Sequence, residues 1–248
     1  MEILHIIEFL GLGVVVGAIS GFFGIGGGTV VVPTMLFLGY DIKTAVGISI
    51  TQMLFSSIFG SYVNYKNNKL KINEGIFVGL GGLFGASLSG YIVSGVKEIY
   101  LEIGLAIALA LTIIKFFKAP QIAEKEINSI YILFIVGFLI GVFAISMGIG
   151  GALFLTPILV GFLGFDIKKA LSMGLFFVVF SSFSGFISLS FAGLVDYKNG
   201  FMLGIGSLLG VYYGVKFSHK IDKSLQKKLL LILYTMMLLM TLKKIFLG

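Results

Sequence analysis

The chain has 248 residues, of which 58% are hydrophobic and only 12% are charged, and its formal net charge is +7. Soluble domains contain about 45–50% apolar and about 25% charged residues, so this composition indicates a membrane protein and excludes a soluble globular domain. Cysteine is absent, which excludes disulfides, thiol redox chemistry and cysteine-ligated metals. All 18 basic residues are lysines spread over short loops, which favours a role in membrane orientation over nucleic-acid binding.

Apolar segments bounded by glycine, asparagine or charged clusters follow one another along the chain. They predict spans at 3–22, 27–38, 44–64, 73–95 and 98–117, and then at 127–146, 151–163, 169–191, 198–217 and 224–246. Glu2 and Glu8 replace the basic start of a signal peptide, so we expect the first span to be a helix of the mature protein. The second span of each half has only about 12 residues, which cover about 18 Å of a hydrocarbon core about 30 Å thick. Non-helical backbone is therefore needed beside these two short helices.

The two halves of the chain share a motif. Residues 23–33 read FGIGGGTVVVP, and residues 147–157 read MGIGGALFLTP. GYDIKTA at 39–45 returns as GFDIKKA at 164–170, so equivalent positions lie about 125 residues apart. A repeat of half the chain length predicts a duplicated unit. We expect an N-terminal transmembrane repeat at 1–120 and a C-terminal transmembrane repeat at 121–248, which together form one transport domain.

The lysines predict how the two repeats are oriented. The loop after the third span carries Lys66, Lys69 and Lys71 in the first half but only Lys198, beside Asp196, in the second. The next loop reverses this bias, with one lysine in the first half and five in the second. Opposite lysine content in equivalent loops is expected when each half crosses the bilayer an odd number of times. We predict an all-α polytopic membrane protein of two inverted-topology repeats of about five spans each, with short broken helices at the midplane and both termini outside.

The glycine-rich segment of each motif lies between an apolar helix and a short helix. Glycine weakens a helix by about 1 kcal/mol, and unpaired amides inside a bilayer are tolerated only where protein or water surrounds them. We therefore expect a cavity between the two breaks, faced by short-helix N-termini whose amides and positive dipole ends suit an anion. Because the chain has no arginine to clamp an anion, backbone N–H groups and hydroxyls must hold it.

The candidate substrate-binding residues are the glycines of the two breaks, a first-turn threonine and polar residues of the third spans. They are Gly24, Gly26, Gly27, Gly28, Thr29, Ser49, Gln52, Ser56, Gly148, Gly150, Gly151, Ser172 and Ser181. Gln52 corresponds to Phe177 in the second half, so a site at this position is expected to be asymmetric.

Structural roles compete with each of these assignments. Glycines in membrane helices often allow close packing, which is the role we expect for Gly75, Gly79, Gly81, Gly85, Gly200, Gly204, Gly206 and Gly210. Serines in such helices often bond the carbonyl of their own preceding turn. Asp41 and Asp166 precede the third spans and are expected to be N-caps.

Enzymatic chemistry has little support in the sequence. His5 and His219 lie at span ends, and no carboxylate lies near a span centre, so neither a serine hydrolase nor a central proton-relay acid is predicted. The glycines lack the strand and the lysine that a nucleotide-binding loop needs. We expect no catalytic activity, no cofactor and no metal site.

The glycine-rich break followed by a short helix with a proline, once in each half, resembles the sulfite exporter TauE/SafE family, also called the sulfonate permease family. The resemblance covers essentially the whole chain, and its most specific part is the doubled motif. It implies a multi-pass transporter of the cell membrane that moves sulfite or organosulfonates, generally outward. Ala152 stands where the first motif has Gly28, which makes the second half-site less open.

The residues favour a carrier that binds a small sulfur-containing anion and alternates access by rocking one repeat against the other. An anion channel that uses the same cavity is the alternative. The sequence leaves open the coupling to a proton or sodium gradient and the formation of a homo-oligomer. No nucleic-acid partner is expected.

Overall fold

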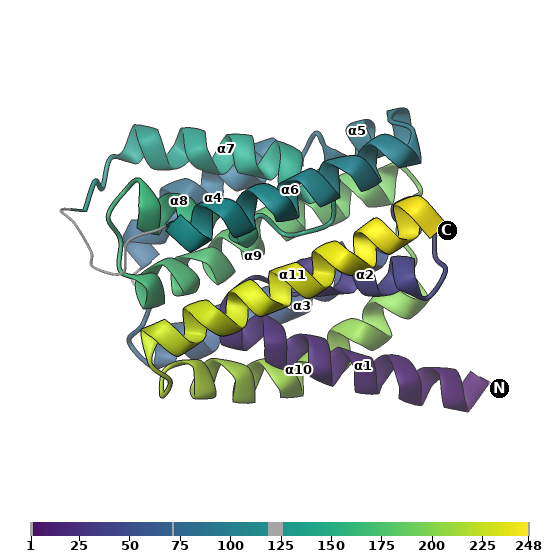
Figure 1. The fold of residues 1–248 in the computed structure, drawn as a ribbon, viewed down its shortest axis with the longest axis horizontal. Coiled ribbons are helices and arrows are strands. Elements are labelled where there is room, and N and C mark those ends of the chain that lie inside the picture. The colour runs from purple at the N-terminus through teal and green to yellow at the C-terminus, as the bar shows by residue number, and fades with distance from the viewer. Residues whose placement is uncertain (1, 71, 119–125, 248) are drawn as a thin grey trace.

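The computed structural model describes residues 2–70, 72–118 and 126–247, and these residues form a bundle of eleven helices without a strand (Figure 1). The helices are α1 (Glu2–Phe23), α2 (Gly28–Phe37), α3 (Ile42–Lys66), α4 (Ile72–Ala86), α5 (Ser89–Gly95), α6 (Glu98–Lys118), α7 (Ile130–Ser146), α8 (Ala152–Gly161), α9 (Ile167–Phe191), α10 (Tyr197–Ser218) and α11 (Lys223–Leu247). The predicted all-α class is therefore confirmed over the described part of the chain.

Six helical stretches of the described chain are long and apolar enough to cross a bilayer. They are Ile3–Phe23, Ile42–Lys66, Gly75–Gly95, Ile167–Phe191, Tyr197–Ser218 and Ser224–Phe246. Three shorter apolar helices, α2, α7 and α8, accompany them. The chain is a multi-pass membrane protein, as its composition predicts.

The predicted span 73–95 is interrupted between α4 and α5. Ser87 Oγ donates to the carbonyl oxygen of Phe84 (2.7 Å), and the carbonyl oxygen of Ser87 accepts from Ser188 Oγ of α9 (2.7 Å). Ser188 Oγ also accepts from the Gly90 amide (2.9 Å). Serines that bond nearby backbone compete with helical hydrogen bonds. The interruption depends on a partner from a distant helix, so the apolar character of the segment does not reveal it.

The first glycine break turns the chain back toward the end at which it entered the bundle. His5 of α1 bonds Asn199 at the start of α10 (Nε2···Oδ1 2.8 Å). Phe37, the last residue of α2, lies under Lys243 Nζ near the end of α11 (4.5 Å to the ring centroid). Figure 1 shows both chain termini at this end of the bundle. The predicted span 27–38 is therefore the returning arm of a helical hairpin and does not cross.

The second break reverses the chain in the same way, and the two arms that it joins, α7 and α8, meet at the opposite end of the bundle. The Ile127 amide, before α7, donates to the carbonyl oxygen of Leu163, after α8 (2.9 Å). Lys169 Nζ also pairs with Glu126 Oε2 there (2.7 Å). The predicted span 151–163 is therefore also the returning arm of a helical hairpin and does not cross. Because a helix of ten residues is about 15 Å long, α2 and α8 are too short to cross by themselves, and the left-handed glycines before them reverse the chain.

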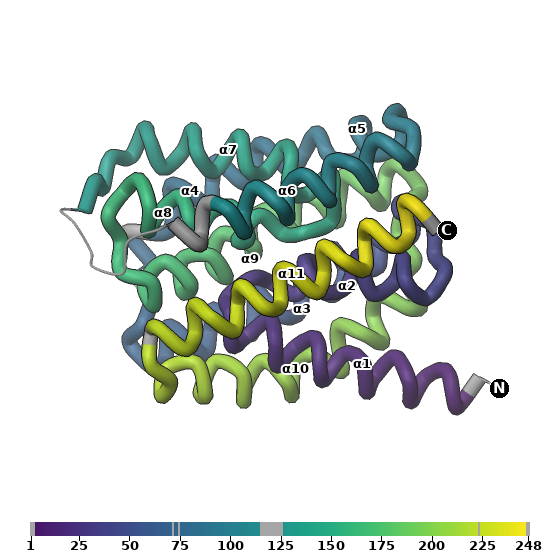
Figure 2. Tube along the Cα trace, viewed as in Figure 1, coloured from purple at the N-terminus to yellow at the C-terminus, as the bar shows by residue number. Residues whose placement is uncertain are grey.

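The interior of the bundle is formed by α3 and α9 (Figure 2). In each of them 67% of an apolar stretch of 18 residues is buried, against 28% of the corresponding stretch in α11. They pack against each other, and each also packs against a helix of the other half, α3 against α10 and α9 against α4. The first helices pack in the same reciprocal way, α1 against α10 and α7 against α4. The packing pattern is thus alike in the two halves.

Glycines allow these helices to approach closely, as predicted. A methyl group at Gly81 or Gly85 would overlap the backbone of α7, and one at Gly206 or Gly210 would overlap the backbone of α1. The remaining four predicted packing glycines face side chains of α9 or α3, namely Gly75 and Phe176, Gly79 and Phe180, Gly200 and Thr51, and Gly204 and Phe55. Small residues at helix contacts supply van der Waals packing inside a bilayer, where the hydrophobic effect between helices is weak.

Two hydrogen bonds repeat with the same register as the sequence. Lys43 Nζ, in the first turn of α3, donates to the carbonyl oxygen of Ser94 (3.4 Å). Lys168 Nζ, in the first turn of α9, donates to the carbonyl oxygen of His219 (3.1 Å). Each acceptor lies 51 residues after its lysine, and the two pairs are 125 residues apart. The two bonds lie at opposite ends of the bundle, because α3 and α9 begin at opposite ends.

The starts of the interior helices are capped as the sequence predicts. Asp41 accepts a hydrogen bond from the Thr44 amide (2.9 Å), and Asp166 accepts one from the Lys168 amide (2.9 Å). An aspartate N-cap satisfies one of the amides that a helix leaves unpaired. Both aspartates therefore have the structural role that was expected of them.

Candidate functional site

The two glycine breaks adopt the same unusual backbone conformation. Gly24, Gly26 and Gly27 have φ of 65°, 79° and 90°. Their counterparts Gly148, Gly150 and Gly151 have φ of 70°, 76° and 78°. Side chains rarely adopt this left-handed region, so the conformation explains why glycine occupies these positions. The doubled motif is therefore a doubled chain reversal.

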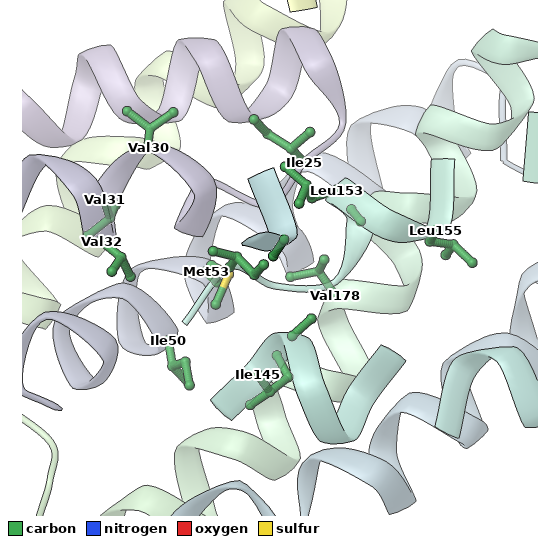
Figure 3. Packing of buried hydrophobic residues seen from close by; sticks show 14 of the residues in the cluster. Ile25, Val30, Val31, Val32, Ile50, Met53, Ile145, Leu153, Leu155 and Val178 are labelled. Carbon is green, nitrogen blue, oxygen red and sulfur yellow. The ribbon is translucent and has the colours of Figure 1, made fainter. Parts of the chain in front are cut away.

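The breaks lie in direct contact with each other. A methyl group at Gly28 would overlap the carbonyl oxygen of Gly148, which also accepts a hydrogen bond from Ser49 Oγ of α3 (2.6 Å). Met53 of α3 and Val178 of α9 fill the space beside this contact. Figure 3 shows Ile25, Met53 and Val178 among the buried hydrophobic side chains of the core. The structure thus brings the predicted glycines of both halves together at one place in the core.

The short helices present their N-termini at the breaks. Gly27 is the N-cap of α2, and its carbonyl oxygen accepts from the amides of Val30 and Val31 (2.9 and 3.0 Å). The amides of Gly28 and Thr29 precede these first helical bonds, and α2 has no side-chain cap. α8 begins in the same way after Gly151, also without a side-chain cap. Thr29 is in the first turn of α2, as predicted, and its hydroxyl is fully buried without a hydrogen-bond partner among the described residues.

Equivalent residues of α3 and α9 cover the two N-termini, but their chemistry differs. A methyl group at Gly27 would overlap the side-chain amide of Gln52, and one at Gly151 would overlap the ring of Phe177. Gln52 is fully buried, and neither its Oε1 nor its Nε2 has a hydrogen-bond partner within the described chain. Leaving such a group unpaired costs about 1–3 kcal/mol. The predicted asymmetry is present, because the first break faces an amide and the second faces an aromatic ring.

The predicted serines have different surroundings. Ser49 donates to Gly148, and Ser56 Oγ donates to the carbonyl oxygen of Gly26 (3.0 Å), so both hydroxyls hold the backbone of the breaks. Ser181 donates to the carbonyl oxygen of Val178 in its own helix (3.5 Å). The hydroxyls of Ser49 and Ser56 therefore stabilise the reversed chain and do not point a free donor at a ligand.

The expected cavity between the breaks is not open in this structure. Thr29, Gln52, Met53 and Val178 are each 0% exposed, so no water-sized space reaches them. The side chains of Met53 and Val178 occupy the region in which a cavity was predicted. The unpaired amides of the breaks are therefore surrounded by protein, which is the other environment that a bilayer protein allows them.

Ser172 lies elsewhere, in a small polar cleft at the end of the bundle opposite the termini. The cleft has a volume of about 10 Å³, the space of one water molecule. Its walls are Gly21, Gly24, Asn64, Lys168, Leu171, Ser172, Leu175, Ser218 and His219. Gly24 belongs to the first break, so one wall of the cleft is part of that break. Sequence reasoning missed Asn64, Lys168 and His219, although Lys168 stands in register with Lys43.

A much larger cavity of about 680 Å³ lies between α1, α10 and α11. Apart from Lys216 and Lys220, its walls are apolar or aromatic, and they include the exposed side chains of Phe217, Ile232 and Met236. Such a surface suits lipid and offers few hydrogen-bond donors to a small anion. Clusters of three or more metal-ligating side chains are absent from the described residues.

Comparison with known proteins identifies relatives along almost the whole chain. The sequence profile of the family described as "Sulfite exporter TauE/SafE" matches residues 9–243. A probable membrane transporter protein of Bacillus subtilis, YdhB, is 29% identical, and the match covers 85% of this chain and 89% of that protein. A probable membrane transporter protein of Methanocaldococcus jannaschii, MJ0441, is also 29% identical over 92% of this chain and 90% of its own. No solved structure matches the chain.

Proposed function

Because the chain belongs to the sulfite exporter TauE/SafE family, we propose that it carries a small sulfur-containing anion, such as sulfite or an organosulfonate, across the cell membrane, generally outward. The family and the named relatives are membrane transporters. The choice of anion rests on the family description and on the chemistry of the breaks.

The anion is held at the first glycine break. The observation that carries this proposal is the buried, unpartnered amide of Gln52, which lies against Gly27 at the uncapped N-terminus of α2. An anion site in this chain must use uncharged hydrogen-bond donors, because the chain has no arginine. The donors at the first break are Gln52 Nε2, the Thr29 hydroxyl and the backbone amides of Gly28 and Thr29. Donors in a dry environment at a helix N-terminus favour a negative charge. The second break packs against the first, and the Phe177 ring makes the surroundings of the α8 N-terminus apolar.

The two halves act as inverted repeats, 1–120 and 121–248. Each consists of a helical hairpin, α1–α2 or α7–α8, followed by three crossings. An odd number of crossings per half places the second repeat upside down relative to the first, in agreement with the loop lysines. Support comes from the hydrogen bonds of Lys43 and Lys168, which are equivalent in sequence but lie at opposite ends of the bundle.

Transport then requires the two breaks to separate. Their contact leaves no space for an anion, so the closed arrangement excludes passage through the centre. Rocking one repeat against the other opens the first break to one side at a time. A structure closed at its binding site supports a carrier over a channel with a permanent path.

The function is tested by anion flux in sealed liposomes that contain the purified protein, with and without an imposed proton or sodium gradient. We expect saturable flux of sulfite or a small sulfonate, and the effective gradient identifies the coupling ion. Gly26→Leu and Gly150→Leu force a side chain into a left-handed position and are expected to abolish flux while the protein still inserts. Currents that do not saturate would support the channel instead, and normal flux in both variants would place the site elsewhere.

A further inference from the structure

The polar cleft exists at only one end of a duplicated fold. Shifted by 125 residues, its polar wall residues Asn64, Ser172 and Ser218 correspond to Leu189, Gly47 and Val93. At that other end a methyl group on Gly47 would overlap the carbonyl oxygen of Leu194, so backbone closes the equivalent position. One lysine is retained at each end, Lys168 and Lys43, and His219 corresponds to the polar Ser94, whereas Asn64, Ser172 and Ser218 have no polar counterpart. A difference of this kind between two equivalent ends is not required by the fold and calls for a function.

The cleft offers donors to an anion. Lys168 Nζ is held at its mouth by the carbonyl oxygen of His219 (3.1 Å). Ser218 Oγ accepts from Gln226 Nε2 (2.8 Å), which leaves its own proton available, and Ser172 supplies a second hydroxyl. The cleft holds one water in this arrangement, so binding of a larger anion requires the Lys168 side chain to leave the His219 carbonyl oxygen.

His219 has one ring nitrogen engaged and one free. Its Nε2 lies 2.9 Å from Asn64 Oδ1, which can only accept, so Nε2 carries the proton as the amide is assigned. Its Nδ1 is buried without a partner among the described residues. Burial lowers the pKa of His219, and the charges of Lys69 and Lys168 lower it further. Beside these lysines, the ring bonds the uncharged Asn64 of α3, and the preceding residue Ser218 bonds the uncharged Gln226 of α11.

We propose that this cleft is a second anion site, at which Lys168, Ser172 and His219 receive the small oxyanion at the lysine-rich end before it reaches the first break. The inference rests on the transport function proposed above and adds the side from which the anion is loaded. Under the positive-inside rule this end is cytoplasmic, which agrees with export. Gly24, shared by the cleft and the break, joins the two sites.

Loading is linked to a proton. In the empty cleft the His219 pKa is lowered, so the ring is neutral near pH 7. A bound anion favours the charged ring and raises this pKa, so the anion binds together with a proton at Nδ1. Anion affinity therefore rises as the pH falls through the range between the two pKa values.

The test uses inside-out membrane vesicles, in which the cytoplasmic end faces the medium. Lys168→Gln is compared with Lys43→Gln, the equivalent change at the other end, by initial rates of radiolabelled sulfite uptake. We expect Lys168→Gln to raise KM about tenfold to a hundredfold with little change in kcat, because a charged donor is lost. Lys43→Gln should leave KM unchanged. Equal effects of the two variants, or none, would overturn the loading site.

His219→Gln keeps a donor for Asn64 but cannot take up a proton. With a small organosulfonate, whose own charge does not change near neutral pH, we expect it to abolish the pH dependence of KM, while Lys168→Gln retains a pH dependence. Calorimetric titration of purified protein with the same sulfonate supplies a readout independent of flux, and wild type should take up protons on binding. Binding that requires Lys168 without any flux would support the cleft and refute the transport function. Flux or binding that both variants leave intact would refute the cleft alone, and a wild type that neither binds nor transports sulfite would refute both.

Discussion

Replacing Gln52 with leucine separates stability from transport. The Gln52 amide is fully buried and unpaired at the first break, a situation that costs about 1–3 kcal/mol. Leucine has nearly the same volume and no polar atoms, so Gln52→Leu should increase the stability of the folded protein by up to this amount. The same change removes the side-chain donor for the anion. A hydrogen bond to a charged group is worth about 1.5–3 kcal/mol, so transport efficiency should fall about tenfold to a hundredfold.

The matched control is the equivalent change in the other half, Phe177→Leu. This variant loses ring contacts with Gly82 and Gly151, and we expect it to be less stable by about 0.5–3 kcal/mol while it transports normally. Stability is measured as the melting temperature in detergent, and transport as sulfite flux in liposomes. Binding sites often contain groups that destabilise the fold. If Gln52→Leu transported like wild type, or if its melting temperature fell while that of Phe177→Leu rose, the assignment of the first break as the binding site would be refuted.

Three further predictions concern the breaks and the cap of α3. Gly28→Ala should lower the stability of the fold by about 1–3 kcal/mol and impair transport, because its methyl group overlaps the Gly148 carbonyl oxygen. Ala152→Gly at the equivalent position should lower stability by at most about 1 kcal/mol. Melting temperature measures the stability of both variants, and flux measures their transport. Ser49→Ala leaves the same carbonyl buried and unpaired and should lower stability by about 1–3 kcal/mol in the same melting assay, so an unchanged melting temperature would contradict the contact. Partial burial acts to raise the pKa of Asp41, but hydrogen bonds at the start of α3 outweigh it and lower the pKa. The contribution of Asp41 to the stability of the fold is therefore present above the unfolded pKa and is lost as the pH falls through the folded pKa. Asp41→Ala should therefore be about 0.5–2 kcal/mol less stable than wild type at neutral pH and equal to it in strong acid, as melting curves across pH will reveal.

The sequence predicted most helices because apolar length determines them. The predicted span 73–95 is matched by the membrane-length stretch Gly75–Gly95. The sequence did not predict the break between α4 and α5 inside it, because that break depends on Ser188 of α9, far away in the chain. It also assigned crossings to 27–38 and 151–163. The length argument there was correct, but the direction of the turn depends on three left-handed glycines in each break, which composition alone does not specify.

The sequence predicted where the two glycine breaks lie, and it predicted the surroundings of the candidate residues only in part. The doubled motif identified the two breaks, and the pairing of Gln52 with Phe177 indicated which half is polar. Ser49 and Ser56 were candidates for the ligand, yet they bond backbone carbonyls, because a reversed chain in a dry core leaves carbonyls that need donors. The cleft at Lys168 was not predicted because its walls come from α1, α3, α9 and α10, which only the fold brings together.

The most direct test of the account is to locate a bound anion. Selenite has the shape and charge of sulfite, and its selenium can be located by anomalous scattering in crystals of the protein. We predict a selenium peak within hydrogen-bond distance of Gln52 Nε2 and the N-terminus of α2, accompanied by separation of Gly28 from Gly148. A selenium peak at another place in the bundle, with the two breaks still in contact and Gln52 still unpaired, would contradict the account.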